Sequence, residues 1–231
     1  MRALAGFPDA VRESPAHSMS PLAASNASTR PGTGAPRVLV FAGSARSGSL
    51  NKRLAKVAAE AVVAAGGEVT LLDLADHRLP VYDGDLEAAE GVPAAARRLR
   101  EIMRAHDALL IVSPENNASV PAALKNALDW VSRPVDGQNG LVPYRGKVAA
   151  LLAASPGALG GLRGLVHLRQ ILASLGVLVL SEQFALPRAH EHLPESGGLA
   201  DAKHHATVSG VARRLVEVAA RLAPPAPEAT P

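Results

Sequence analysis

The sequence predicts an α/β fold, a doubly wound parallel sheet of five strands with helices on both faces. Short β-branched or leucine-rich runs alternate with longer segments of helical periodicity, which is typical of βαβ units. Hydrophobic residues make up 48% of the 231 residues and charged residues 19%, so the chain can bury one sizeable core. At roughly 150 residues per domain, the length fits one domain with appendages.

Five strand–helix units follow one another between residues 37 and 222. The run RVLVFA at 37–42 predicts a buried strand, and the helix at 50–65 carries an apolar stripe that Gly66 and Gly67 end. The other strands are expected at 68–74, 107–112, 147–154 and 177–180. The other helices are expected at 93–106, 121–132, 162–175 and 199–222.

Some segments are interpreted as structure without function. Asp83, Asp85 and Glu87 are expected in a solvated loop rather than around a cation, and Trp130 in the core rather than at a subunit interface. Residues 1–36, rich in Ala, Ser and Pro, are expected to form a disordered leader, with Met19 as an alternative start of translation. Residues 223–231 read as a Pro-rich tail.

Composition excludes several classes of function. Cysteine is absent, which removes disulfides, thiolate metal sites and a cysteine nucleophile, and is compatible with the expected cytoplasmic location. A net charge of +3 and 3% aromatic residues argue against a nucleic-acid partner. The longest apolar runs are far shorter than the roughly 20 residues of a membrane span, so a soluble protein without a membrane partner is expected.

Function is expected in three loops, at 43–51, 113–119 and 155–161, that leave the carboxyl ends of strands. Doubly wound sheets bind ligands at that edge, at the switch in strand order. The first loop, GSARSGSLN, offers backbone N–H groups, hydroxyls and a helix N-terminus, which are the donors and the positive field that a phosphate needs. Ser49 stands where a P-loop has lysine, so a monoester is indicated rather than a nucleoside triphosphate. Alternatively, Ser49 or Asn51 only caps the next helix.

The other two loops are less specific taken singly. Asn117 and Ser119 either contact a ligand or cap the following helix, and Glu115 is a candidate general base that has no visible partner. Gly160 and Gly161 either admit a flat ligand or form a turn.

Two further chemistries find little support in the sequence. The segment around Ser155 faintly resembles a hydrolase nucleophile elbow, but Pro156 lacks the N–H that an oxyanion hole needs. The histidines at 190, 192, 204 and 205 lack a metal-ligand spacing and are expected at the surface.

Three longer motifs run through these loops. GSxRxxSxN is present as Gly43, Ser44, Arg46, Ser49 and Asn51. PEYNxSxPxxLKNAxDW appears as Pro114, Glu115, Asn117, Ser119, Pro121, Leu124, Lys125, Asn126, Ala127, Asp129 and Trp130. SxGxxGGxR appears as Ser155, Gly157, Gly160, Gly161 and Arg163. Together they resemble the NADPH-dependent FMN reductase family of flavodoxin-like folds, which includes quinone and chromate reductases, over nearly all of residues 37–222.

The resemblance implies strand order 2-1-3-4-5, FMN as cofactor, and NADPH or NADH as co-substrate. The FMN-binding residues that it implies are Ser44, Arg46, Ser49, Leu50, Asn51, Pro114, Glu115, Asn116, Asn117, Ser155, Gly157, Gly160 and Gly161. No side chain is expected to act as acid or base, because hydride passes to the flavin and electrons then pass to a small acceptor such as a quinone, chromate or free flavin. Family precedent also implies a homodimer or homotetramer.

One position departs from the family pattern, since Asn116 stands where relatives usually have a tyrosine beside the flavin. The packing of the flavin ring is therefore expected to differ. Two alternatives remain open, a flavodoxin-type electron carrier and a non-catalytic flavin-binding protein. Carriers are typically acidic with aromatic rings flanking the flavin, whereas this chain has a positive net charge and no aromatic residue in its second loop.

Overall fold

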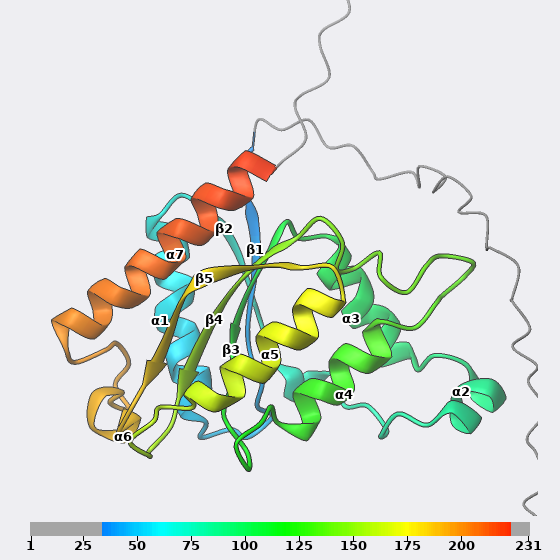
Figure 1. The fold of residues 1–231 in the computed structure, drawn as a ribbon, viewed down its shortest axis with the longest axis horizontal. Coiled ribbons are helices and arrows are strands. Elements are labelled where there is room, and N and C mark those ends of the chain that lie inside the picture. The colour runs from blue at the N-terminus through cyan, green and yellow to red at the C-terminus, as the bar shows by residue number, and fades with distance from the viewer. Residues whose placement is uncertain (1–33, 223–231) are drawn as a thin grey trace, which may run out of the picture. The chain divides into compact units, whose positions relative to one another are not determined.

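The computed structural model describes residues 34–222, and these form a five-stranded parallel sheet (Figure 1). The strands are β1 (Arg37–Ala42), β2 (Glu68–Leu72), β3 (Ala108–Val112), β4 (Val148–Ala154) and β5 (Leu178–Leu186). Their order is β2-β1-β3-β4-β5, and every pairing is parallel, which confirms the predicted fold class and strand order. The expected leader, apart from residues 34–36, and the expected tail lie outside the described residues.

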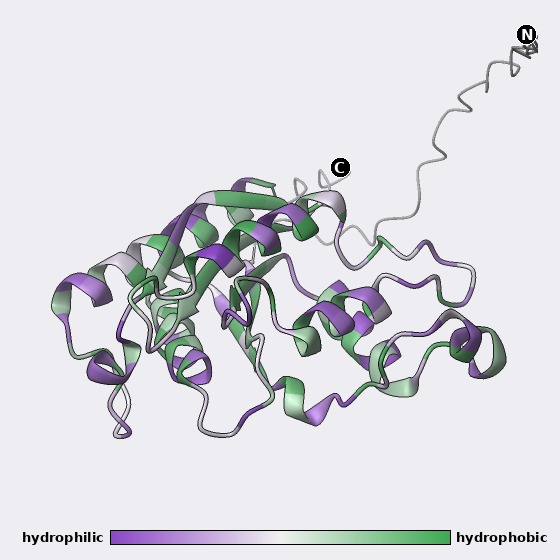
Figure 2. Ribbon diagram, turned by 60° about the horizontal axis from the view of Figure 1, so that its bottom comes forward, coloured by the Kyte–Doolittle hydropathy of each residue, from purple (hydrophilic) through white to green (hydrophobic). Residues whose placement is uncertain are grey.

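Helices cover both faces of the sheet (Figure 1). One face is covered by α1 (Leu50–Ala64) and α7 (Ala202–Leu222), and the other by α3 (Ala94–Arg104), α4 (Ala122–Val131) and α5 (Leu162–Ser174). Side chains alternate across the strands, so Val38 and Val40 pack under α1 while Leu39 and Phe41 pack on the opposite side. Figure 2 shows apolar strands between helices with hydrophilic outer sides. Within residues 34–222, no helix is long and apolar enough to cross a membrane.

The last strand is longer than the sequence indicates. The expected strand at 177–180 continues as β5 to Leu186, through the polar residues Ser181, Glu182 and Gln183. Because β5 is an edge strand, polar side chains can face solvent there without loss of pairing. After it, α6 (Ala189–His192) precedes α7, which begins at Ala202 rather than at 199.

The segment between β2 and α3 corrects one prediction. β2 ends at Leu72 and a short 3₁₀ helix, η1 (Leu74–Asp76), follows. The expected solvated loop contains α2 (Gly84–Glu90), whose first turn is capped by the Asp83 carboxylate. The segment packs on Trp130, which is fully buried as predicted and donates its indole N–H to the Pro80 carbonyl at 2.8 Å.

A buried lysine lies at the opposite edge of the sheet from the three loops. Lys147 directly precedes β4, is 7% exposed, and donates from Nζ to the His106 carbonyl. Burial lowers the pKa of its ammonium from the ordinary value of 10.5 to about 8. Its neighbour Asp107 is paired with Arg37 at 2.9 Å.

Candidate functional site

The three predicted loops meet at one edge of the sheet and line a cavity of about 500 Å³. They meet there because β1, β3 and β4 are adjacent parallel strands whose carboxyl ends lie side by side. The lining consists of residues 43–46, 49–51, 114–116, 121–123 and 154–156. Of the predicted site residues, the cavity brings together Ser44, Arg46, Ser49, Leu50, Asn51, Pro114, Glu115, Asn116 and Ser155.

The start of α1 has the features of an anion site. Ser49 occupies the N-cap position and is 4% exposed, yet its hydroxyl makes no capping hydrogen bond, so the hydroxyl and the N–H groups of Leu50 and Asn51 remain available. The first turn contains no acidic residue, and its Lys52 and Arg53 are paired with Asp73 and Glu195. Because Ser49 makes no side-chain capping bond, the simple capping interpretation does not account for it. An anion bound at this helix N-terminus would be favoured by the helix dipole.

Arg46 lies in the same loop and is exposed. Its guanidinium donates to the Gly48 carbonyl at 3.0 Å, and its backbone N–H donates to the Ser44 hydroxyl at 3.3 Å. Arg46 also lines the first cavity and carries a full positive charge. An anion at the helix N-terminus would thus meet both fixed dipoles and a full positive charge.

Asn51 lines the cavity but its amide is already engaged. Nδ2 donates to the Ala154 carbonyl at 2.8 Å, and Oδ1 accepts from the Ala154 N–H at 2.9 Å. Because Ala154 is the last residue of β4, this pair of bonds fastens the start of α1 to the start of the third loop. The buried Asn51 side chain therefore joins these two segments of the chain.

Glu115 is not the solitary carboxylate that the sequence indicated. It bonds the Arg163 guanidinium and accepts from the backbone N–H groups of Arg163 and Gly164, at 3.0 and 3.2 Å, at the start of α5. Burial on its own raises the pKa of a carboxyl, but the bonds from Arg163 and Gly164 hold the pKa of Glu115 below its ordinary value. A carboxylate held ionised by three donors is a poor general base, and its role is to join the second loop to α5.

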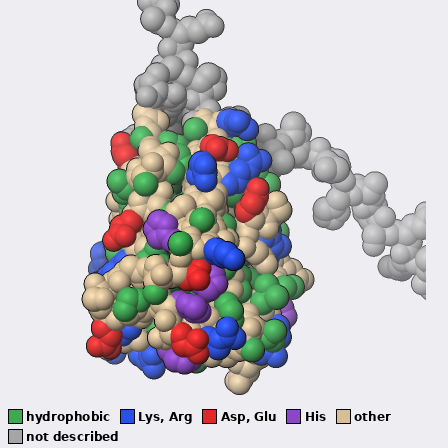
Figure 3. Space-filling model, turned by 90° about the vertical axis from the view of Figure 1, so that its left-hand side faces the viewer, with side chains coloured by type: hydrophobic (Ala, Val, Ile, Leu, Met, Phe, Trp, Pro, Cys, Tyr) green, Lys and Arg blue, Asp and Glu red, His purple; other side chains and the backbone are tan. Residues whose placement is uncertain are grey.

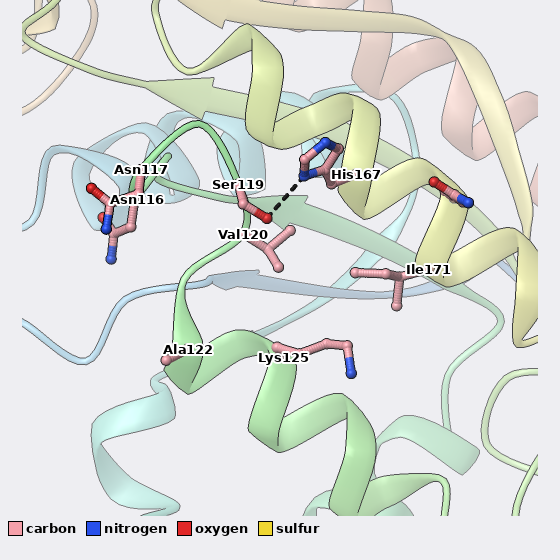
Figure 4. A pocket seen from close by; sticks show the side chains of 9 residues that line it. Asn116, Asn117, Ser119, Val120, Ala122, Lys125, His167 and Ile171 are labelled. Carbon is pink, nitrogen blue, oxygen red and sulfur yellow. Dashed lines mark hydrogen bonds between the residues drawn. The ribbon is translucent and has the colours of Figure 1, made fainter.

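The second loop turns back on itself as a two-residue hairpin. Asn116 and Ser119 exchange two backbone hydrogen bonds of 3.0 Å, with Asn117 and Ala118 at φ of 48° and 62° between them. The expectation that Asn117 or Ser119 caps the next helix is wrong, because α4 has Pro121 at its N-cap position and no side-chain cap bond. Instead the Ser119 hydroxyl lies 2.9 Å from Nδ1 of His167 (Figure 4).

A second cavity, of about 680 Å³, lies between this hairpin, α4 and α5 (Figure 4). Asn117 lines this cavity and not the first one. Asn116 and Ala122 line both, so the two cavities adjoin at these side chains. A ligand in the first cavity therefore has open space beside it.

The third loop contributes less to the first cavity than predicted. The Ser155 hydroxyl accepts from the Gly157 N–H at 3.1 Å and keeps its own proton free to donate. Gly160 and Gly161 have φ of 63° and 95° and are buried, and a Cβ on Gly160 would lie 2.7 Å from backbone atoms of Ala185 and Leu186. Close packing against the end of β5 explains glycine at 160. Gly157, Gly160 and Gly161 do not line the first cavity.

The four histidines lie on α6 and the first turn of α7. Figure 3 shows histidines on this side of the molecule interspersed with acidic and basic side chains. The rings of His192 and His204 are 4.6 Å apart, edge to face. Among residues 34–222, no group of three His, Asp or Glu side chains is arranged to hold a metal.

Sequence reasoning missed one part of the lining, the start of α4. Pro121, Ala122 and Ala123 border the first cavity, and their small side chains leave room for a flat group next to the hairpin. The run of small residues directly after a functional loop was the available signal. The cavity thus offers hydrogen-bond donors to an anion at the start of α1 and a wall of small side chains at the start of α4. Its volume is typical of cofactor pockets.

These donors fit FMN, which has a phosphate at one end and a planar ring at the other. Among the residues that line the cavity, the Glu115 carboxyl is held ionised by its bonds to Arg163 and Gly164, because they keep its pKa below the ordinary value. Ser155 is bonded to a backbone N–H rather than to a histidine within the described residues. Such a site suits a bound cofactor that carries the reactive chemistry itself.

Comparison with known proteins also indicates a flavin-dependent reductase. The model of the NADPH-dependent FMN reductase family matches residues 36–191. A quinone reductase of Escherichia coli is 39% identical over 146 residues, 63% of this chain and 74% of that protein. An NAD(P)H-dependent FMN reductase of Pseudomonas aeruginosa is 40% identical over 168 residues, 72% of this chain and 86% of that protein. Among solved structures, the flavoenzyme NAD(P)H:acceptor oxidoreductase FerB of Paracoccus denitrificans superposes with a TM-score of 0.67 at 32% identity, covering 80% of this chain and 98% of that one.

Proposed function

The chain belongs to the NADPH-dependent FMN reductase family, and from that premise we propose that it passes electrons from NADPH or NADH to a quinone through FMN held by the three loops. Membership makes it an FMN-dependent NAD(P)H oxidoreductase with a small-molecule acceptor. The quinone is inferred from relatives such as the Escherichia coli quinone reductase. A cytoplasmic homodimer or homotetramer completes the proposal.

One observation carries the placement of FMN, the uncapped start of α1 at the edge of the first cavity. Ser49 is buried beside the cavity without a capping bond, and Arg46 lines the same cavity. In the proposal, the Ser49 hydroxyl, the N–H groups of Leu50 and Asn51 and the Arg46 guanidinium bind the phosphate, and Ser44 orients Arg46. Asn51 holds this end of the site against β4.

The remaining lining residues orient the ring and control its surroundings. When bound, FMN supplies the redox chemistry, accepting hydride from NAD(P)H and passing electrons to the acceptor. Ala122 and Ala123 leave space for the ring, Leu50 and Pro114 give apolar walls, and Asn116 borders the opening to the second cavity. Contact of the ring with Asn117, Gly157, Gly160 or Gly161 stays a prediction.

Steady-state kinetics of the FMN-loaded full chain tests the proposed activity. NADPH or NADH with 1,4-benzoquinone should be consumed without any protein partner, as a reductase requires. An Arg46→Ala variant should bind FMN about tenfold more weakly, because one charged hydrogen-bond donor is lost. Arg98→Ala, which removes an exposed arginine on α3, is the matched control and should leave FMN affinity unchanged.

The same assay separates the alternatives. Turnover that appears only after adding a dedicated protein reductase would identify an electron carrier. Bound FMN that no nicotinamide cofactor reduces would identify a non-catalytic flavin-binding protein. Either result contradicts the proposal.

A further inference from the structure

A basic groove borders the first loop, residues 43–51, next to the first cavity. Its volume is about 650 Å³, and it adjoins the first cavity at Ala45 and Ser49, which line both. Its charged lining consists of Lys52, Arg53, Lys56 and Arg78 with Asp73 and Glu195, an excess of two positive charges. Nothing in the proposed FMN site uses this excess.

Two of the four cations are neutralised by partners. Lys52 pairs with Asp73 at 2.6 Å, and Arg53 pairs with Glu195 at 3.0 Å. Lys56 and Arg78 are exposed and form no ion pair within the described residues. The uncompensated charge of the groove therefore resides on Lys56, from α1, and on Arg78, from the segment that follows η1.

An apolar slot opens beside the groove. The slot has a volume of about 180 Å³ and shares Lys52, Lys56 and Asp73 with the groove. Its apolar lining is Ala42, Ala55, Leu71 and Leu72, and the Asp76 carboxylate also borders it. Leu71 lies on the edge strand β2 and is 47% exposed, so a large apolar side chain stands uncovered next to the cationic groove. A planar base carrying a nearby phosphate would match both features.

The position of this pair of cavities has a general physical parallel. In dinucleotide-binding α/β sheets, a phosphate binds at the N-terminus of the first helix and the adenosine ribose lies at the carboxyl end of the second strand, where an arginine accommodates a 2′-phosphate. Here the groove lies between the first turns of α1 and the end of β2, and Arg78 follows that strand.

We propose that the slot and the groove bind the adenosine 2′-phosphate end of NADPH, with the base beside Leu71 and the 2′-phosphate between Lys56 and Arg78. The inference rests on the proposed function for the identity of the hydride donor. It makes Lys56 and Arg78 the residues that discriminate NADPH from NADH, because NADH lacks the 2′-phosphate and its charge of nearly −2. The nicotinamide end would then pass Ala45 and Ser49 into the first cavity and extend along bound FMN to its ring.

Direct binding tests this without reliance on turnover. The FMN-loaded full chain is titrated calorimetrically with 2′,5′-ADP and with 5′-AMP, which differ by the 2′-phosphate. The expected result is at least about tenfold tighter binding of 2′,5′-ADP, since two charged contacts are at stake. In Lys56→Ala and Arg78→Ala, the affinity for 2′,5′-ADP should fall about fivefold each while 5′-AMP is little changed.

Matched controls come from exposed cations on α7. Lys203→Ala and Arg213→Ala remove the same charges elsewhere and should leave both affinities unchanged. In steady state, the ratio of kcat/KM for NADPH to that for NADH should fall about fivefold in each groove variant and stay constant in the controls.

Equal binding of the two nucleotides, or equal loss in groove and control variants, would overturn the inference. Its failure is distinguishable from failure of the proposed function. If the wild-type chain does not bind FMN or does not oxidise NADH, the proposed function is refuted. If turnover is present but 2′,5′-ADP binds no more tightly than 5′-AMP, only this site is refuted.

Discussion

Replacing Asn51 by alanine tests whether one buried amide holds the start of α1 against the end of β4. The substitution removes the bonds of 2.8 and 2.9 Å to Ala154 and leaves the N–H and carbonyl of Ala154 without those partners. Each bond contributes a net of about 1 kcal/mol, and a buried group left unsatisfied costs about 1–3 kcal/mol, so the free energy of unfolding should fall by about 2–4 kcal/mol. The start of α1 should also shift, weakening FMN about tenfold.

Urea denaturation of the FMN-free chain measures the first effect, and quenching of FMN fluorescence measures the second. Asn126→Ala is the matched control, because that amide also makes two backbone bonds, to Tyr82 and Pro80 at 2.8 Å each, but does not line the first cavity. It should lower stability and leave FMN affinity unchanged. A loss below about 0.5 kcal/mol in Asn51→Ala, or equal FMN affinities in both variants, would refute the positioning role.

Three other substitutions give independent checks. Glu115→Gln should lower the free energy of unfolding by about 1 kcal/mol at pH 7 and by less at acidic pH. The wild-type carboxylate stabilises the fold above its unfolded pKa, and this contribution is lost as the pH falls through its lowered folded pKa. An equal loss at pH 7 and pH 3 in urea titrations would contradict this. Ala118→Gly should raise the free energy of unfolding by about 0.5–1 kcal/mol, since it relieves a left-handed alanine at φ 62°, and an unchanged urea midpoint would contradict the strain. The free energy of unfolding of the wild-type chain should rise by about 2 kcal/mol between pH 7 and 9.5, because Lys147 binds more protons in the unfolded state than in the folded state, where its pKa is about 8. Lys147→Met should remove that rise. Identical pH profiles for the wild type and this variant would refute the reasoning.

The central architecture could be predicted because local pattern determines it. The runs at β1, β3 and β4 are continuously apolar, which is the pattern of strands buried on both faces, and the loops after them carry the polar residues. The elements that escaped prediction lack such a pattern. α2 buries none of its residues, and β5 carries three consecutive polar residues, Ser181, Glu182 and Gln183, at an edge of the sheet.

Pairings between distant residues could not be predicted from the sequence. Glu115 and Arg163 are separated by 48 positions, and Asn51 and Ala154 by 103, so no local spacing reveals that each pair is bonded. For this reason Glu115 appeared to be a candidate base without a partner, and the bonds of Asn51 to Ala154 were not foreseen. Gly160 was open to two interpretations for the same reason, since the backbone of β5 that it packs against is remote in sequence.

The affinity of the chain for FMN compared with riboflavin tests the central claim most directly, because the two ligands differ only in the phosphate that the start of α1 is inferred to hold. The account predicts saturable binding of one FMN per chain and, from several charged hydrogen bonds, at least about 100-fold weaker binding of riboflavin. Equal affinities for FMN and riboflavin would contradict it.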